Sequence, residues 1–278
     1  DGTVKRSALP AIFNPEDLNA LEMALQIKDK FGGRITVITM GLPAASAILR
    51  DALYRGANEA ILVTDRRCAA SDTLATSYIL SCAVKKIDYD IALCGRQAID
   101  GDTAQVGPQL AEKLGVTQIT YVEELAELEG RTITARRNIS NGWQQVKTAL
   151  PVLLTVTGDA NAPRVAAAKK MMKCKNALAP IEVEQKIKSE NPGAGEAEIK
   201  ELAKLKCSKL TEKGLLMKQW DLETIGADLN WCGQSGSPTK VHRIQSVVLA
   251  AKETKQIEPS EKGISDMIHE LINDKIIA

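Results

Sequence analysis

Short apolar segments alternate with amphipathic ones through the first two-thirds of the 278-residue sequence, and this order constrains the fold more than any other feature. Strand, helix and strand in succession require a crossover connection, so the strands lie parallel in a sheet that helices cover on both faces. We therefore expect an α/β fold with a mostly parallel sheet. Strands are predicted over residues 34–40, 60–64, 91–95, 118–122 and 151–158, and helices over about 14–31, 43–55, 71–86 and 103–114.

The pattern changes after residue 123. Segments 131–139 and 143–149 favour strands, and Asn141-Gly142 between them is typical of a type I′ hairpin turn. We therefore expect an antiparallel hairpin added to the parallel sheet.

The last third divides into three parts. Residues 164–218 contain 13 Lys or Arg and 7 Asp or Glu, which favours a solvated helical excursion, with a docking surface as the alternative. Residues 233–240 are rich in Gly, Ser and Pro and predict irregular structure, and residues 260–277 predict an amphipathic helix. The expected domains are residues 1–232 and a C-terminal arm with a helix over 233–278.

Composition and charge exclude several classes of function. A net charge of +1 and an aromatic content of 3% argue against a nucleic-acid partner. No apolar segment is long enough to predict a membrane span. The six cysteines are widely spaced and there are two histidines, so we expect no metal site. Scattered thiols are typical of the reducing cytoplasm, where we expect the protein.

The loop after the third expected strand is the most informative segment for function. It begins at Cys94-Gly95, contains Gly101 and Gly107, and leads into an expected helix. Ligands bind at the carboxyl ends of parallel strands, and free N–H groups at a helix N-terminus favour an anion such as phosphate. The alternative is an ordinary capped turn. Asp100 and Asp102 have no nucleophile or His beside them, so we predict no catalytic residue.

Four blocks of sequence resemble the β subunit of electron transfer flavoproteins. The longest block is GRQAIDGDTAQVGPQLAEKLG, which begins at Gly95. The others are NPEDLNALE from Asn14, NAPR from Asn161 together with Met172-Lys173, and GSPT from Gly236. The blocks occur in the order found in that family and cover about residues 14–240.

The resemblance implies a Rossmann-like domain that pairs with an α subunit through its C-terminal arm. It also implies a bound nucleotide, which is AMP in one branch of the family and FAD in the electron-bifurcating branch. The AMP-type loop reads Q-A-I-D-D-D-x-N-Q-T-G, whereas this chain has Gly101 in place of the middle carboxylate. Losing that charge beside a phosphate favours a diphosphate, so we expect FAD, with AMP as the alternative.

In the bifurcating branch, NADH gives a hydride to the β-subunit FAD. One electron then passes to the α-subunit FAD and on to an acyl-CoA dehydrogenase-like or other flavin dehydrogenase, and the other passes to ferredoxin or flavodoxin. Arg96 and Arg164 are candidates for a cation beside the flavin. The alternatives are a non-bifurcating subunit with structural AMP and a single α-subunit FAD, or a nucleotide-sensing protein without a redox role.

By position, the resemblance assigns cofactor contacts to residues from the first helix to the loop. Asp72 and Thr73 also have a simpler explanation, because they are favoured at a helix N-terminus. The expected contacts are Asn14, Met40, Gly41, Asp72, Thr73, Gly95, Arg96, Gln97, Gly101, Asp102, Thr103, Ala104, Gln105, Val106 and Gly107.

The sequence departs from the family in three places. The strand that usually precedes this segment is absent from the sequence, and we expect a truncated or incompletely recorded N-terminus. Ala168 stands where AMP-type relatives have a Leu that anchors dehydrogenases, which leaves the choice of partner open. The segment over residues 186–216 is longer than the corresponding segment in the family, and we interpret it as an insertion.

Overall fold

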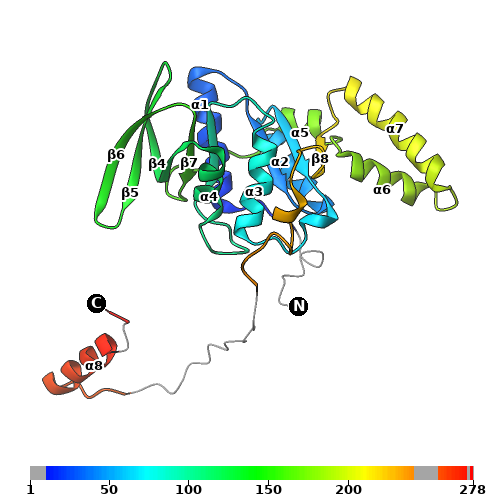
Figure 1. Cartoon of the computed structure of the whole chain (residues 1–278). Helices are drawn as coiled ribbons and strands as arrows, with labels where there is room; N and C mark the ends of the chain where they lie inside the picture. The colour runs from blue at the N-terminus through cyan, green and yellow to red at the C-terminus, as the bar shows by residue number, and fades with distance from the viewer. Residues whose placement is uncertain (1–10, 241–255, 274–275, 278) are drawn as a thin grey trace. The chain divides into compact units, whose positions relative to one another are not determined.

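The computed structural model describes residues 11–240, 256–273 and 276–277. These divide into two compact units, with the boundary between residues 240 and 241 (Figure 1). The helices of the first unit are α1 (Pro15–Phe31), α2 (Ser46–Arg55), α3 (Thr73–Val84), α4 (Val106–Leu114), α5 (Ala168–Cys174), α6 (Pro180–Glu190) and α7 (Glu196–Glu212). Its strands are β1 (Thr36–Met40), β2 (Glu59–Val63), β3 (Ile91–Gly95), β4 (Thr117–Glu129), β5 (Thr132–Ile139), β6 (Gly142–Ala149), β7 (Val152–Val156) and β8 (Lys218–Trp220).

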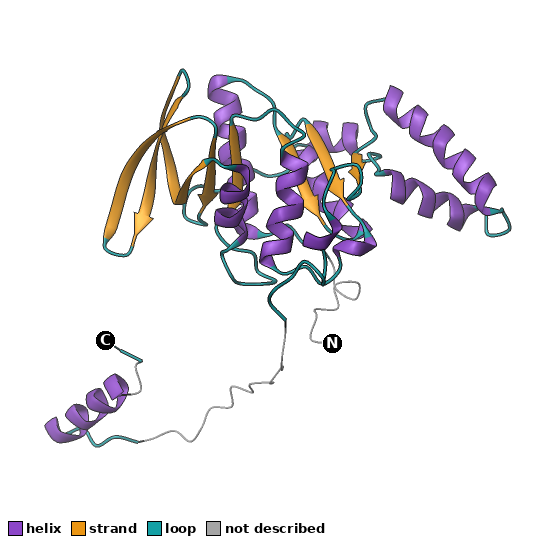
Figure 2. Ribbon diagram, viewed as in Figure 1, coloured by secondary structure: helices purple, strands orange, loops and turns teal. Residues whose placement is uncertain are grey.

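The strands form two sheets, where the alternation of the sequence led us to expect one. Figure 2 shows the strands in two groups. The first sheet is fully parallel with the order β1-β2-β8, and the second has the order β3-β7-β4-β5-β6. The α/β class is confirmed, including parallel pairing of β1 with β2 and of β3 with β7. In the described chain, β1 and β3 are edge strands and are half-buried along their length, whereas β7 is buried throughout.

Strand β4 is longer than predicted. We expected it to end at residue 122, but it continues to Glu129. Its first part pairs in parallel with β7 and its second part pairs antiparallel with β5. The acidic residues after Val122 conceal the strand, because a run of Glu is typical of helix or loop rather than of a sheet.

The hairpin of β5 and β6 is confirmed, but its predicted turn type is wrong. Ile139 pairs with Gly142, so the turn residues are Ser140 and Asn141, one position earlier than expected. Neither of them has a positive φ, which a type I′ turn requires at both central residues. The positive φ of 142° belongs to Gly142, at the start of β6.

The predicted helical excursion consists of α5, α6 and α7, and the last two project together from the sheets (Figure 1). Val183, Ile187 and Ile199 are buried between α6 and α7. The chain then returns to β8, which pairs in parallel with β2. Periodicity could not reveal β8 because three residues are too few to show an alternating pattern.

The main core lies under the five-stranded sheet. Apolar side chains of β4, β5 and β7 pack there against Ala20 and Met23 of α1. Val122, Ile133, Val152 and Leu154 are fully buried. Burial of one such side chain contributes about 1.5–3 kcal/mol relative to exposure, so this cluster holds α1 against the sheet.

The second unit contains α8 (Glu261–Asn273), close to the predicted helix over 260–277. Ile264, Ile268 and Ile272 follow one another at four-residue spacing and are each 41–49% exposed. The helix therefore carries an apolar stripe along one face. No helix in the described part of the chain is long and apolar enough to cross a bilayer.

Candidate functional site

The loop between β3 and α4 is irregular through Gln105, and α4 begins at Val106 rather than at Thr103 as predicted. Asp102 and Ala104 have φ values of 52° and 54°, which an α-helix does not allow. The side chain of Gln97 donates a hydrogen bond to Asp102 and closes the loop across its base. Thr103, Ala104 and Gln105 thus lie in a compact turn ahead of the helix.

The first turn of α1 binds the first half of this loop. The N–H of Gly95 donates to Asp17 at 2.6 Å, and the N–H of Gln97 donates to Glu16 at 2.8 Å. The Asn14 side chain accepts from the N–H of Ile99 at 3.1 Å and donates to the Gln97 carbonyl at 2.9 Å. Asn14 therefore contacts the predicted loop. The sequence did not reveal this anchoring role of Glu16 and Asp17.

The second half of the loop offers free donors. The N–H groups of residues 103–107 donate no hydrogen bond to any other described residue. Ala104 is left-handed and Gln105 right-handed, with φ −100° and ψ −27°, and successive N–H groups in such a pair converge on an anion. The N-terminus of α4 adds its partial positive charge. We call residues 103–107 the anion cradle, and this donor set fits a phosphate or diphosphate.

The three glycines of the loop differ in what they do. A methyl group on Gly95 would lie 2.6 Å from the backbone nitrogen of Asp17, and one on Gly107 would lie 2.7 Å from Cγ2 of Thr155. Both glycines are thus required by packing between elements. A methyl group on Gly101 would meet nothing within 4 Å. The fold does not require glycine at 101, so its role is better sought in a ligand.

Helix α3 lies beside the cradle. The hydroxyl of Thr73 donates to the side chain of Gln105 at 2.9 Å, so the structure brings these two predicted contacts together. Asp72 has another role. Its carboxylate caps α3 at the N–H of Ala75 and accepts from the N–H of Thr239, each at 2.9–3.0 Å. Burial opposes ionisation of Asp72, but these hydrogen bonds hold its pKa below the usual value.

Residues 233–240, which we assign to the arm from the sequence, are fixed to the same place. The hydroxyl of Ser237 accepts from the N–H of Asp72 at 2.8 Å and donates to the carbonyl of Gly233 at 2.7 Å. Ser237 is 4% exposed. The start of the arm is therefore held against the N-terminus of α3, next to the cradle.

No hydrogen bond between described residues joins Met40 or Gly41 to the cradle. Met40 packs against an apolar cluster that includes Val63 and Ile79. The N–H of Gly41 donates to the carbonyl of Val63 at 3.0 Å. Their assignment as cofactor contacts remains a prediction.

The two candidate cations have different surroundings. The Arg96 guanidinium lies 2.9 Å from Glu16 and 5.5 Å from the ring centre of Tyr121, beside the loop. Arg164 is bound to Glu22 at 2.8 Å and to Asp29 at 2.9 Å, both on α1. Because two carboxylates neutralise Arg164, Arg96 is the better candidate for a cation near a ligand.

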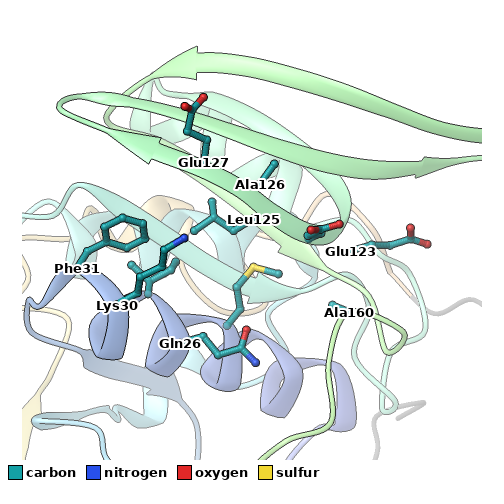
Figure 3. Close-up of a pocket in the computed structure, with 11 residues that line it drawn as sticks. Gln26, Lys30, Phe31, Glu123, Leu125, Ala126, Glu127 and Ala160 are labelled. Carbon is teal, nitrogen blue, oxygen red and sulfur yellow. The ribbon is translucent and has the colours of Figure 1, made fainter.

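A hollow of about 160 Å³ lies elsewhere, between the C-terminal half of α1 and the middle of β4 (Figure 3). Glu123, Glu124 and Glu127 line it together with a single cation, Lys30. This lining repels phosphate, and the hollow shares no residue with the anion cradle. We therefore place the candidate nucleotide site at the cradle.

Comparison with known proteins gives the family. Residues 1–203 match the model described as "Electron transfer flavoprotein domain". The chain belongs to the electron transfer flavoprotein family. It is 40% identical over 242 residues to "Electron transfer flavoprotein subunit beta" of Clostridium acetobutylicum, which covers 87% of this chain and 78% of that protein.

Two further relatives cover nearly the whole chain. "Electron transfer flavoprotein subunit beta" of Megasphaera elsdenii is 37% identical, over 99% of this chain and 92% of its own length. "Protein FixA" of Sinorhizobium fredii is 38% identical, over 97% of this chain and 84% of its own length. The resemblance seen in the sequence is thus confirmed at the level of the electron transfer flavoprotein family and its β-type subunits.

Proposed function

We propose that this chain is the β subunit of an electron-bifurcating electron transfer flavoprotein and binds FAD through its diphosphate at the anion cradle. The proposal rests on the N–H groups of residues 103–107, which donate to no other residue that the structure describes. This number of donors is larger than a single side-chain acceptor would use. The donors belong to the loop that follows the carboxyl end of β3, where α/β folds bind nucleotides.

Gly101 supports FAD over AMP. The loop already carries the carboxylates of Asp100 and Asp102, and a third one at position 101 would add repulsion to a diphosphate. Because neither backbone conformation nor packing requires glycine there, the open space beside it is available to the ligand. AMP alone in the cradle would instead indicate a non-bifurcating subunit that supports a single α-subunit flavin.

The protein positions the cofactor and tunes its charge. FAD, when bound, would supply the chemistry of taking the two electrons of a hydride from NADH and releasing them singly. One would go to the α-subunit FAD and from there to a flavin dehydrogenase, and the other to ferredoxin or flavodoxin. The cradle N–H groups hold phosphate oxygens. Arg96, fixed by Glu16, places a cation at the mouth of the loop. No nucleophilic side chain is needed, and we place the complex in the cytoplasm.

The surface at Ala168 bears on the dehydrogenase partner. Ala168 begins α5 and is exposed, and the neighbouring Val165 and Met172 are 83% and 66% exposed. Lys169 and Lys173 lie between and beside them. A dehydrogenase that docks here would contact exposed apolar side chains, including an adaptable Met, with lysines between and beside them. It would not contact a single Leu anchor.

Flavin content tests the cofactor proposal. Two flavins per heterodimer are expected for the wild type, and one flavin with one AMP would contradict it. Gly101→Asp should weaken FAD at this site by about tenfold or more because it adds a charge and bulk beside the cradle. Gly101→Ala is the matched control: it adds a methyl group without a charge and should weaken FAD binding less than Gly101→Asp does. Flavin stoichiometry by absorbance and nucleotide release measure the result.

Removal of the terminal helix α8 tests the proposed heterodimer. The apolar stripe of α8 is expected to dock on the α subunit, so deletion of residues 260–278 should weaken the heterodimer. A protein that still sediments as an intact heterodimer at micromolar concentration would contradict this role. A charge change on the polar face of α8, Glu270→Gln, serves as the control and should leave assembly unchanged.

A further inference from the structure

Tyr121 has a backbone conformation that its side chain disfavours. Its φ is 59°, in the left-handed region, where bulky non-glycine residues are rare. It lies in β4, in the short interval where pairing with β7 shifts register between Ile119 and Val122. Strained residues of this kind cluster at functional sites when the surrounding structure holds them in place.

The bulge is held from both neighbouring strands. On β7, the buried hydroxyl of Thr155 accepts from the N–H of Tyr121 at 3.1 Å. On β5, Arg137 donates to the carbonyl of Thr120 at 3.0 Å and to its hydroxyl at 2.8 Å. These contacts fix residues 120 and 121, so the left-handed conformation is built into the sheet.

Thr155 also connects the bulge to the anion cradle. Its hydroxyl binds Tyr121, while its methyl group lies against Gly107, where an added methyl would approach it to 2.7 Å. The backbone of Tyr121 and the first turn of α4 are therefore neighbours of one side chain. Tyr121 remains 40% exposed, although the Arg96 guanidinium lies 5.5 Å from its ring centre.

An exposed aromatic ring on a backbone that Thr155 joins to a set of phosphate donors is suited to a ligand that has both a phosphate and a planar ring. We infer that Tyr121 is a stacking platform for the planar ring of the nucleotide whose phosphate binds at residues 103–107, with Arg96 fixing the platform. This inference rests on the proposed nucleotide site. Stacking of a base on an aromatic side chain changes affinity by roughly 5- to 100-fold.

The test uses the full chain co-purified with its α subunit and stripped of nucleotide. Tyr121→Phe, Tyr121→Ala and Tyr121→Gly are compared with the wild type by calorimetric titration with FAD, AMP and inorganic pyrophosphate. We expect Tyr121→Phe to bind as the wild type does. The Tyr121→Ala and Tyr121→Gly variants should bind FAD about 5- to 100-fold more weakly, and their affinity for pyrophosphate should be unchanged. If the Ala and Gly variants also lose affinity for AMP, the ring that stacks on Tyr121 is the adenine. If their affinity for AMP is unchanged, the ring is the flavin.

Stability separates a platform from a structural residue. Glycine adopts a φ of 59° without strain, so Tyr121→Gly should keep or raise the thermal midpoint of the nucleotide-free protein while it lowers ring affinity. Wild-type FAD affinity in both the Ala and Gly variants would overturn the inference alone. Equal losses of affinity for FAD and for pyrophosphate in these variants would also overturn the inference. A wild-type protein that binds no nucleotide would overturn the proposed function, and this inference with it.

Discussion

Gly95→Ala is expected to destabilise the protein by about 3 kcal/mol. The new methyl group would lie 2.6 Å from the backbone nitrogen of Asp17 and 2.7 Å from the backbone carbon of Glu16. Backbone atoms of a helix cannot move aside as a flexible side chain can, so α1 must shift as a whole. Overpacking of this kind costs about 1–3 kcal/mol, and the bonds from the N–H groups of Gly95 and Gln97 weaken as well.

Gly101→Ala is the matched control for this change. Both substitutions remove the same backbone freedom from the unfolded chain, and neither glycine has a left-handed φ. Position 101 is open, so its substitution should change the free energy of unfolding by less than about 1 kcal/mol. Urea denaturation of the two variants measures the difference. Equal stabilities would show that α1 does not approach β3 as closely as described.

Glu22→Ala is expected to destabilise the protein by about 2–3 kcal/mol. The Glu22 side chain is 6% exposed and accepts the N–H of Arg164 at 3.0 Å and two guanidinium bonds at 2.8 and 2.9 Å. Removing one partner leaves the other charge and a backbone donor unpaired. The loss falls short of a fully buried pair because Arg164 is 34% exposed and keeps Asp29.

The Glu22 effect should depend on pH. Burial by itself raises the pKa of Glu22, but the bonds from Arg164 outweigh it and hold the pKa below the ordinary 4.5. The ion pair therefore stabilises the fold fully above pH 4.5, and this contribution is lost as the pH falls through the lowered pKa. The stability gap between wild type and Glu22→Gln should be constant near neutral pH and narrow in acid.

Asp29→Asn provides the control on the same arginine. Asp29 is 62% exposed, and an exposed ion pair contributes at most about 1 kcal/mol. Thermal denaturation of the Glu22 and Asp29 variants across pH measures both effects. Equal effects of the two variants at neutral pH would mean that Arg164 is anchored by surface charge alone rather than by the buried carboxylate.

The predicted and observed bounds of particular helices and strands show which features local sequence encodes. The start of the first helix was predicted to within one residue, because the fixed φ of Pro15 suits the first helical position. Strands β2 and β3 were predicted closely from continuous apolar residues. The helix start at Thr103 was wrong because two left-handed residues, Asp102 and Ala104, displace it to Val106, and non-glycine residues give no local signal for that conformation.

The candidate site was found from the sequence only in outline. The loop and its glycines were identified, but the resemblance assigned all three glycines alike as cofactor contacts. The structure separates them, since Gly95 and Gly107 pack against other elements and Gly101 does not. Tyr121 was missed entirely, because its conformation depends on the register of β4 against β7.

Local sequence determined the order of the helices and strands as far as β7, the α/β class and the position of the loop, because capping, periodicity and backbone preference act over a few residues. The tertiary structure alone decided that the strands form two sheets and that Glu22 meets Arg164 across 142 positions. It also decided that α1 occupies the N–H groups of Gly95 and Gln97, while those of residues 103–107 donate to no other residue in the described part of the chain. Steric fit and hydrogen-bond competition between distant segments settle these features, and neither is encoded within any one segment.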